Sequence, residues 1–365
     1  MSTEKPFDVC IIGAGPGGYV AAIRSAQLGL RVALVEKGET LGGTCLNVGC
    51  IPSKALLESS RLYTQMRDEG ALHGIRADGL TVDIEAMMAR KQGVVNALAS
   101  GVRTLVKENG VALFQGTARL VGPNEIDLSA ADGASQRLMA RNFVLATGSV
   151  PTGLPNLPFD GTVVVDSTAA LSFECAPSTL VVVGGGAVAC DCAVTARSRG
   201  ATQVELFALE KISEMPLPHE EMAELFHNGI HINGRTKVAS IAVGDKGIEG
   251  IDTQKVAFEA GDQPLPAAPV QFSLRGLADV AGTEQTRNDI QHVIIAIGNR
   301  SAFARQEGVV YAGDCKHGPS AVVEAVASGK NAAAEIDAFL SNTTCEPPPR
   351  PLKSCHTVAG YSRLP

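Results

Sequence analysis

Short runs of consecutive apolar residues, each closed by a turn, recur along this chain and predict buried strands. The first run covers residues 7–12 and leads into a glycine-rich turn. An alanine-rich stretch with helical spacing then reaches Leu28, and a second apolar run covers residues 31–36 and ends in glutamate. A strand, a tight turn, a helix and another strand in this order predict the opening of a doubly wound, parallel α/β sheet.

The same pattern occurs a second time in the middle of the chain. There, residues 180–183 form the apolar run, residues 184–186 the glycine turn and residues 204–207 the next strand. Each copy is followed by a later apolar strand that ends at a glycine, Gly148 in the first copy and Gly298 in the second. This duplication predicts an α/β protein with two Rossmann-like dinucleotide-binding domains.

The remaining periodic stretches indicate how the two domains are ordered along the chain. Residues 44–66 and 82–107 are expected to be helices, and short strands are expected at residues 111–114, 117–120 and 125–128. Near the end, an apolar run, a Gly-Asp pair and a helical stretch predict a return to the first domain. We expect four parts: a first domain at residues 1–150, an inserted second domain at 151–298, a return segment at 299–340 and a proline-containing, linker-like tail at 341–365.

The composition supports a globular protein without a nucleic-acid or membrane partner. Of 365 residues, 45% are hydrophobic and 19% charged, which is enough to build sizeable cores. The net charge of −7, the aromatic content of 4% and the lack of tryptophan argue against binding to nucleic acid or an anionic membrane. No apolar run reaches the roughly 18 residues of a membrane span. Nine cysteines in so long a chain predict a cytoplasmic protein rather than a secreted disulfide framework.

Three glycines occupy the first turn at the spacing of a dinucleotide fingerprint. Gly13, Gly15 and Gly18 lie between strand and helix, and Glu36 ends the next strand. Glycine here allows a tight turn, a close approach of the backbone to pyrophosphate and close packing of helix on strand, while the glutamate can bind a ribose hydroxyl. This context favours dinucleotide binding over a purely structural turn.

The second turn is expected to bind a nicotinamide cofactor. It carries Gly184, Gly186 and Ala189, and alanine is a permitted third residue of the fingerprint. An NADP site of this type has an arginine near the end of the second strand to hold the 2′-phosphate. Residues 207–211 contain one lysine and no arginine, which favours NAD over NADP.

Cys45 and Cys50 are the sharpest chemical signal in the chain. Two thiols at this spacing near a helix start are close enough to bridge, and the helix N-terminus favours a thiolate. Because they follow the first dinucleotide-binding unit, they suggest an electron relay through a disulfide. Two buried cysteines on one helix turn, or part of a metal site, are the alternatives. The close Cys-x2-Cys pairs typical of zinc and iron–sulfur sites do not occur, so no bound metal is expected.

Other thiols and charges are interpreted as structural. Cys10 is expected in a strand core, and Cys190 and Cys192 are expected to pack as small apolar residues on a helix. The glutamate-rich run at residues 214–224 is expected to be an exposed helix. The two cysteines of the tail are assigned no role.

The stretch from Gly42 to Leu56, which contains both thiols, resembles the flavin-dependent pyridine nucleotide-disulfide oxidoreductases. Residues 7–186 are most similar to dihydrolipoamide dehydrogenase within that group. Residues 180–340 resemble instead the small subunit of glutamate synthase and the flavin module of dihydropyrimidine dehydrogenase. Both families contain an FAD domain with a nicotinamide domain inserted into it.

The resemblance implies roles for individual residues. Cys50 would face the flavin, Cys45 would exchange with a dithiol substrate, and Lys54 would lie near the isoalloxazine ring. Asp191 stands where the dehydrogenases have a glutamate partner for this lysine. The implied FAD-binding residues are Gly13, Gly15, Pro16, Gly17, Gly18, Glu36, Lys37, Gly43, Thr44, Gly116, Thr147, Gly148 and Asp314. The expected NAD-binding residues are Gly184, Gly186, Ala189 and Gly298.

The chain departs from the dehydrogenases at its end. It stops about one domain short of their length. The missing part corresponds to their interface domain, which forms the dimer and supplies a His–Glu acid–base pair, so the oligomeric state stays open. The first hypothesis is an NAD-linked, FAD-dependent disulfide oxidoreductase acting on a small dithiol or a lipoyl-bearing protein. The second hypothesis is an NAD(P)H-oxidising FAD module that passes electrons to an iron–sulfur or ferredoxin partner. The third hypothesis is a non-catalytic flavin-binding scaffold. The intact thiol motif favours the first, and the missing histidine weakens it.

Overall fold

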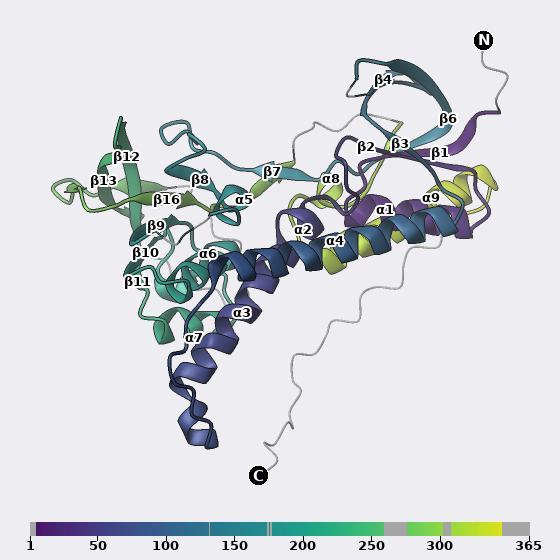
Figure 1. Ribbon diagram of the computed structural model, residues 1–365. Coiled ribbons are helices and arrows are strands. Elements are labelled where there is room, and N and C mark those ends of the chain that lie inside the picture. The colour runs from purple at the N-terminus through teal and green to yellow at the C-terminus, as the bar shows by residue number, and fades with distance from the viewer. Residues whose placement is uncertain are drawn as a thin grey trace.

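The first apolar run becomes the centre of a seven-stranded sheet (Figure 1). The structure is a computed structural model that describes residues 5–130, 132–173, 175, 177–258, 276–301 and 308–344. Strand β1 pairs in parallel with β2 and β6, and the strand order is β3-β2-β1-β6-β5-β4, with β18 also pairing with β6. The strand bounds are β1 (Phe7–Ile12), β2 (Val32–Glu36), β3 (Ala112–Gln115), β4 (Thr117–Gly122), β5 (Glu125–Ser129), β6 (Ser135–Leu145) and β18 (Val310–Tyr311).

Strand β6 is longer than the sequence predicts, because it serves two partners. Its first half pairs antiparallel with β5, and its second half pairs in parallel with β1 and β18. Only its last three residues, Phe143 to Leu145, form a continuous apolar run, since only there is the strand buried on both faces. The alternating, half-exposed first half gave no clear signal.

Helices pack on one face of this sheet. They are α1 (Pro16–Gln27), α4 (Ile84–Glu108) and α9 (Val322–Leu340), with the short α2 (Gly43–Asn47) and α8 (Asp314–His317) at the edge. A Cβ at Gly329 of α9 would overlap the carbonyl oxygen of Gly17 in α1, so only glycine lets the two helices approach this closely. The predicted return segment thereby becomes part of the first core.

One helix expected over residues 44–66 is in fact two, and this prediction is wrong. Helix α2 ends at Asn47, and α3 (Cys50–Asp68), with the 3-10 turn η1 (Gly70–His73) after it, begins anew. Between them Gly49 has φ −141° and ψ −110°, far from helical values, and a Cβ there would lie 3.0 Å from the Thr44 carbonyl oxygen. The break makes Cys50 the first residue of a long helix.

The second copy of the pattern builds a five-stranded parallel sheet of order β11-β10-β9-β16-β8. Its strands are β8 (Val164–Asp166), β9 (Thr179–Val183), β10 (Gln203–Phe207), β11 (His231–Asn233) and β16 (His292–Ile295). One face is covered by α5 (Ser167–Ala170), α6 (Ala187–Ser198) and α7 (His219–His227), with the 3-10 turn η2 (Ile212–Glu214) preceding α7. The parallel α/β class predicted from the duplication is confirmed.

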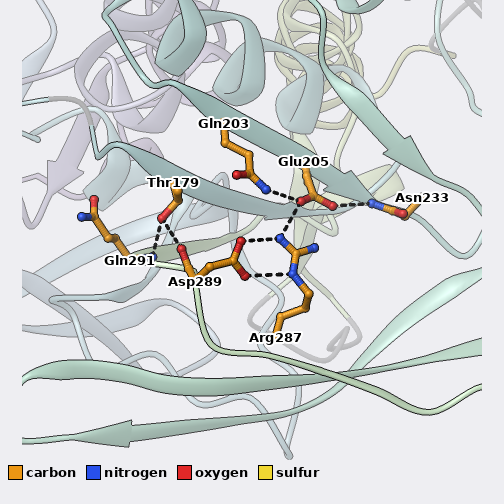
Figure 2. A network of polar contacts seen from close by, with 7 residues as sticks. All are labelled: Thr179, Gln203, Glu205, Asn233, Arg287, Asp289 and Gln291. Atoms are coloured by element: carbon orange, nitrogen blue, oxygen red, sulfur yellow. Dashed lines mark hydrogen bonds and ion pairs between the residues drawn. The ribbon is translucent and has the colours of Figure 1, made fainter.

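The other face carries an antiparallel sheet that the sequence did not predict. It consists of β12 (Thr236–Gly244), β13 (Gly247–Phe258), β14 (Leu277–Asp279) and β15 (Gln285–Arg287). A polar network then ties β15 to β10 (Figure 2). Arg287 contacts the carboxylates of Glu205 and Asp289 at 2.9 and 2.8 Å, and Gln203 and Asn233 donate the remaining hydrogen bonds to Glu205.

The two units are joined by a two-stranded antiparallel ribbon. The chain leaves the first sheet through β7 (Ser149–Pro151) and returns through β17 (Asn299–Ser301), which pair with each other. All five strands of the second sheet lie between these two segments in sequence. Helix α4 extends from the first unit towards the second (Figure 1), and its Lys91 ammonium donates to the Leu171 carbonyl oxygen at 2.9 Å. The expected tail at residues 345–365, with Cys345 and Cys355, lies outside the described residues.

Candidate active site

The first glycine turn and Glu36 meet at the carboxyl end of β1 and β2. Gly13 has φ +100°, and a Cβ there would overlap the Ala146 carbonyl oxygen, so the turn needs glycine. The backbone N–H of Ala14 donates to Oε2 of Glu36 at 2.7 Å, and that of Gly38 donates to Oε1 at 2.9 Å. The carboxylate is thus fixed beside the turn that begins α1.

Segments far apart in sequence complete the rim of this turn. The Gly43 backbone is so close to Gly15 that a Cβ on Gly43 would lie 2.6 Å from the Gly15 Cα. A Cβ on Gly17 would lie 2.8 Å from the backbone nitrogen of Gly313, directly before Asp314. The Gly116 N–H donates to the Glu36 carbonyl oxygen at 2.9 Å.

Further predicted residues lie on the same edge. The Ser149 hydroxyl donates to Oδ2 of Asp314 at 2.5 Å, and the Thr147 hydroxyl lies 3.1 Å from the Cys315 sulfur. Gly148 follows Thr147 with φ +74°. Lys37 is exposed directly after β2. Ser149 was not among the predicted residues, and its contact with Asp314 depends on the β6–β18 pairing, which the sequence does not reveal.

Cys45 and Cys50 face each other across the break between α2 and α3. They are free thiols here, and their side chains hydrogen-bond to each other. This hydrogen bond, which outweighs burial, lowers the pKa of Cys50 to about 7, with help from its own backbone N–H and the Lys54 ammonium. The same hydrogen bond and burial raise the pKa of Cys45. The pair therefore holds one proton on Cys45 and stabilises a thiolate on Cys50.

Lys54 lies one helical turn beyond Cys50 and forms an ion pair with Asp191. The Lys54 Nζ to Asp191 Oδ2 distance is 2.5 Å, so the shorter aspartate does reach the lysine. Burial tends to lower the pKa of Lys54, but the Asp191 carboxylate outweighs this and raises it. The ion pair links α3 of the first unit to α6 of the second.

The second glycine turn repeats the geometry of the first. Gly184 has φ +143°, and a Cβ there would overlap the Ala296 carbonyl oxygen. Ala189 is fully buried against β9, and Gly298 has φ +96° at the end of the β16 segment. The predicted positions thus gather at the carboxyl end of this parallel sheet, where dinucleotides bind in such folds.

Glu210 also belongs to this turn. Its Oε2 lies 2.6 Å from where a Cβ on Gly185 would be, so the carboxylate covers the turn as Glu36 covers the first. An acidic residue about 20 positions after the fingerprint was the available signal. Arg235 also comes close, because it donates to the Leu209 carbonyl oxygen at 3.0 Å, but its guanidinium is paired with Glu214 at 2.8 Å.

The glutamate-rich run at residues 214–224 was expected to be exposed, and this is wrong for two of its members. The Glu214 side chain is 14% exposed in its ion pair with Arg235. Glu221 has one buried carboxylate oxygen without a hydrogen-bond partner. Cys10 and Cys190 are buried, as expected.

Two other kinds of site are absent from the described part of the chain. Among those residues, no helix combines the length and the apolar composition that a membrane crossing needs. Nor does any group of three or more His, Cys, Asp or Glu side chains in the same ranges have an arrangement that could hold a metal ion.

Comparison with known proteins places these features in a family. The sequence pattern of the pyridine nucleotide-disulphide oxidoreductases matches residues 7–329. Dihydrolipoyl dehydrogenase 3 of Pseudomonas aeruginosa is 40% identical over 325 residues, 86% of this chain and 68% of that protein. The dihydrolipoyl dehydrogenase of Trypanosoma brucei brucei is 48% identical over 185 residues, but these are 50% of this chain and 39% of the relative.

Solved structures share the fold. LpdA of Mycobacterium tuberculosis superposes with a TM-score of 0.71 at 19% identity, covering 93% of this chain and 74% of that chain. The flavoprotein disulfide reductase RclA of Escherichia coli, solved as a Cu(II) complex, gives a TM-score of 0.67 at 18% identity, covering 91% and 71% of the two chains. The resemblance of residues 180–340 to the glutamate synthase small subunit stays a prediction.

Proposed function

Because this chain belongs to the pyridine nucleotide-disulphide oxidoreductase family, we propose that it is an NAD-linked disulfide oxidoreductase of the dihydrolipoyl dehydrogenase type. The cofactors of this family are FAD and a pyridine nucleotide. The observation that carries the proposal is the placement of the thiol pair: Cys45 lies in α2, Cys50 begins α3, and the Lys54–Asp191 ion pair lies one helical turn beyond Cys50. The chain spans 39% and 58% of the first two curated relatives, so activity, substrate and partners rest on this site.

The two glycine turns fit their cofactors. Gly15 has φ −69°, and a Cβ there would meet only the Gly43 Cα at an ordinary 3.8 Å. Gly186 has φ −100°, and no protein atom lies within 4 Å of its Cβ position. Neither backbone conformation nor packing requires glycine at these two positions. A pyrophosphate that approaches the backbone does, which supports FAD at the first turn and NAD at the second.

Residues of the chain then divide the binding work. At the first turn, Glu36 would accept hydrogen bonds from the adenosine ribose, and Asp314, held by Ser149, would hold the flavin's ribitol side. At the second, Glu210 would accept from the ribose of NAD. Bound FAD supplies the two-electron link between the thiol pair and the pyridine nucleotide.

The thiol pair performs the exchange with substrate. A thiolate of the dithiol attacks the Cys45 sulfur of the Cys45–Cys50 disulfide, and Cys50 leaves as a thiolate. The second substrate thiol then attacks its own sulfur in the mixed disulfide, releases Cys45 and leaves the substrate oxidised by two electrons. Cys50 leaves at the start of α3 and near the Lys54 ammonium, both of which favour its thiolate, and Cys45 takes up a proton on its own release. The proposed substrates are small dithiols or a lipoyl-bearing protein, in the cytoplasm.

An anaerobic titration of the FAD-loaded protein with NADH tests this function. We expect a two-electron-reduced species with thiolate-to-flavin charge-transfer absorbance and two additional alkylatable thiols. Cys50→Ser should abolish turnover with dihydrolipoamide and leave flavin reduction by NADH intact, whereas Cys175→Ser, at an exposed thiol, should change neither. If Cys50→Ser keeps full dithiol turnover, or if both thiols are free in the air-oxidised protein, the proposal fails. Wild-type turnover with a ferredoxin and none with a dithiol would favour the iron–sulfur alternative.

The position of Glu210 predicts a preference for NADH over NADPH. A carboxylate over the turn binds a ribose hydroxyl and repels a 2′-phosphate. Stopped-flow reduction should therefore be more efficient with NADH in the wild-type protein. Glu210→Gln should narrow the difference by raising the efficiency with NADPH, and a wild-type preference for NADPH would contradict this reading of the site.

A further inference from the structure

Three charged side chains near the thiol pair come from three different helices: Lys54, Asp191 and Glu221. Lys54 of α3 forms its 2.5 Å ion pair with Asp191 of α6. Glu221 belongs to the first turn of α7, which packs on α6 next to Asp191, and the Cys190 thiol donates to the Glu221 carbonyl oxygen at 3.5 Å. Glu221 interacts electrostatically with both Lys54 and Asp191. One ammonium group is thus in contact with the Asp191 carboxylate and under the electrostatic influence of the Glu221 carboxylate.

Glu221 is unusual for a residue at the start of an exposed helix. Its Oε2 is buried and makes no hydrogen bond to any described residue. Burial first, and then the Asp191 and Glu224 carboxylates, raise the pKa of Glu221, while the Lys54 ammonium opposes this. A buried carboxylate without a partner is costly unless a nearby cation compensates it. Lys54 is the cation that acts on it.

Lys54 also acts on the redox thiol. Its charge favours the Cys50 thiolate, and the Asp191 charge opposes it. A second carboxylate near the same ammonium must reduce the positive potential that reaches Cys50, because the fields of all three groups add. Cys45, Lys54 and Asp191 are the side chains that act most strongly on Cys50, and the Glu221 charge adds a weaker contribution of the same sign as Asp191.

We propose that Glu221 is a positioning residue of the thiol centre, which shares the Lys54 ammonium with Asp191 and so limits how strongly that ammonium stabilises the Cys50 thiolate. The inference rests on the proposed function only in treating Cys50 as the reactive thiol. It assigns to α7, an element of the second unit, an effect on chemistry in the first.

The test is the pH dependence of Cys50 alkylation in the reduced, full-length protein. Iodoacetamide reacts with the thiolate, and peptide mass spectrometry measures modification at Cys50 separately from the other thiols. Glu221→Gln keeps the side-chain shape and removes the charge, and should move the Cys50 profile down by roughly 0.5 pH unit. Glu221→Asp should restore a profile close to that of the wild type. Glu221→Ala should shift the Cys50 profile in the same direction as Glu221→Gln. It replaces Glu221→Gln in the test if that variant does not fold.

Glu220→Gln is the matched control. Glu220 is the preceding residue of the same helix turn, carries the same charge and is exposed. It should leave the Cys50 profile unchanged. If both glutamine variants shift the profile equally, a general charge or helix-terminus effect explains it and the proposal is overturned. It is also overturned if Glu221→Gln and Glu221→Ala fold and neither shifts the profile.

The assay separates this inference from the proposed function, because it needs no NAD, dithiol or turnover. A shift specific to Glu221 in a protein that does not oxidise dihydrolipoamide would support the charge coupling and reject the function. Normal dihydrolipoamide turnover with no shift of the Cys50 profile would support the function and reject the charge coupling.

Discussion

At the scale of single residues, Gly15 and Gly186 occupy matching places in the two glycine turns. Neither the backbone conformation nor the packing of the protein requires glycine at these two positions. Their φ angles are negative, and a Cβ would meet ordinary contact or open space. Gly13 and Gly184 differ, because their φ angles are positive and a Cβ would overlap a carbonyl oxygen. The second pair serves the turn, and the proposed function assigns the first pair to ligand binding.

We therefore expect Gly15→Ala and Gly186→Ala to separate binding from folding. Each should change the free energy of unfolding of the apoprotein by no more than about 0.5 kcal/mol, since the entropic gain and the loss at the helix N-cap offset each other. Gly15→Ala should lose FAD affinity, and Gly186→Ala should lose NADH affinity with FAD retained. Urea unfolding and fluorescence titration measure both quantities. Gly13→Ala, the control, should lose stability by more than 1 kcal/mol, about the cost of a strained backbone. Equal destabilisation by all three would refute the distinction.

Much of the residue-level site could be predicted from sequence, because the fingerprint glycines, Glu36 and the thiols sit at fixed local spacings. Glu221 and the Lys54–Asp191 contact could not, because they depend on how α3, α6 and α7 pack. Glu210 lies between these cases. Its spacing from the second turn is a local sequence signal, whereas its position over Gly185 depends on the fold.

At the scale of elements, the network around Glu205 shows why β10 holds a buried charge in an otherwise apolar strand (Figure 2). Burial alone would raise the pKa of Glu205, but the hydrogen bonds from Arg287, Gln203 and Asn233 outweigh it and lower the pKa. A depressed pKa in the folded state means that ionised Glu205 stabilises the fold. That contribution is complete above the unfolded glutamate pKa of about 4.3 and is lost as the pH falls through the lower folded value.

Arg287→Ala should thus destabilise the second unit by roughly 1–3 kcal/mol at pH 7, because it leaves Glu205 ionised and poorly compensated. Glu205→Gln in the same background should recover part of the loss. Urea unfolding at pH 7 and pH 4 measures both effects, and the cost of Arg287→Ala should shrink at the lower pH. Lys237→Ala, which breaks an exposed ion pair with Asp279 on the same antiparallel sheet, should cost less than 1 kcal/mol. A pH-independent cost of Arg287→Ala would contradict this account.

The strands that continuous apolar runs predict are the ones buried on both faces. Continuous apolar runs identified β1, β2, β9, β10 and β16. The antiparallel β12–β15 sheet is half exposed and alternates apolar with polar residues, so it left no comparable run. The break between α2 and α3 was not predicted, because only two residues, Val48 and Gly49, interrupt a stretch whose pattern is otherwise helical.

At the scale of the whole molecule, the first unit is assembled from two segments separated by the entire second sheet. The Gly17–Gly313 approach, the Ser149–Asp314 hydrogen bond and the α1–α9 contact all join the two segments. This return was predictable from its Gly-Asp pair and helix. The division at residues 150 and 298 stays a prediction, and so does the oligomeric state.

A chain that ends after residue 298 should therefore lose FAD, because β18, α8 and α9 are removed from the site and from the first core. A chain that ends after residue 344 keeps these elements and is the control. Flavin absorbance after gel filtration and the near-ultraviolet circular dichroism of each protein measure the outcome. Full FAD retention by the shorter chain would show that the return segment is dispensable for binding.

Helix α6 begins at the second glycine turn and, within its first two turns, presents Asp191 to Lys54. The proposed nucleotide site and the ion pair that acts on Cys50 therefore both involve helix α6. Any change in the position of α6 on binding NAD alters the electrostatic energy of the Cys50 thiolate through that ion pair. Thermodynamic reciprocity then requires the ionisation and redox state of the thiols to alter nucleotide affinity by the same factor. Under the proposed function, such a movement would make nucleotide binding and thiol chemistry linked equilibria before any electron moves.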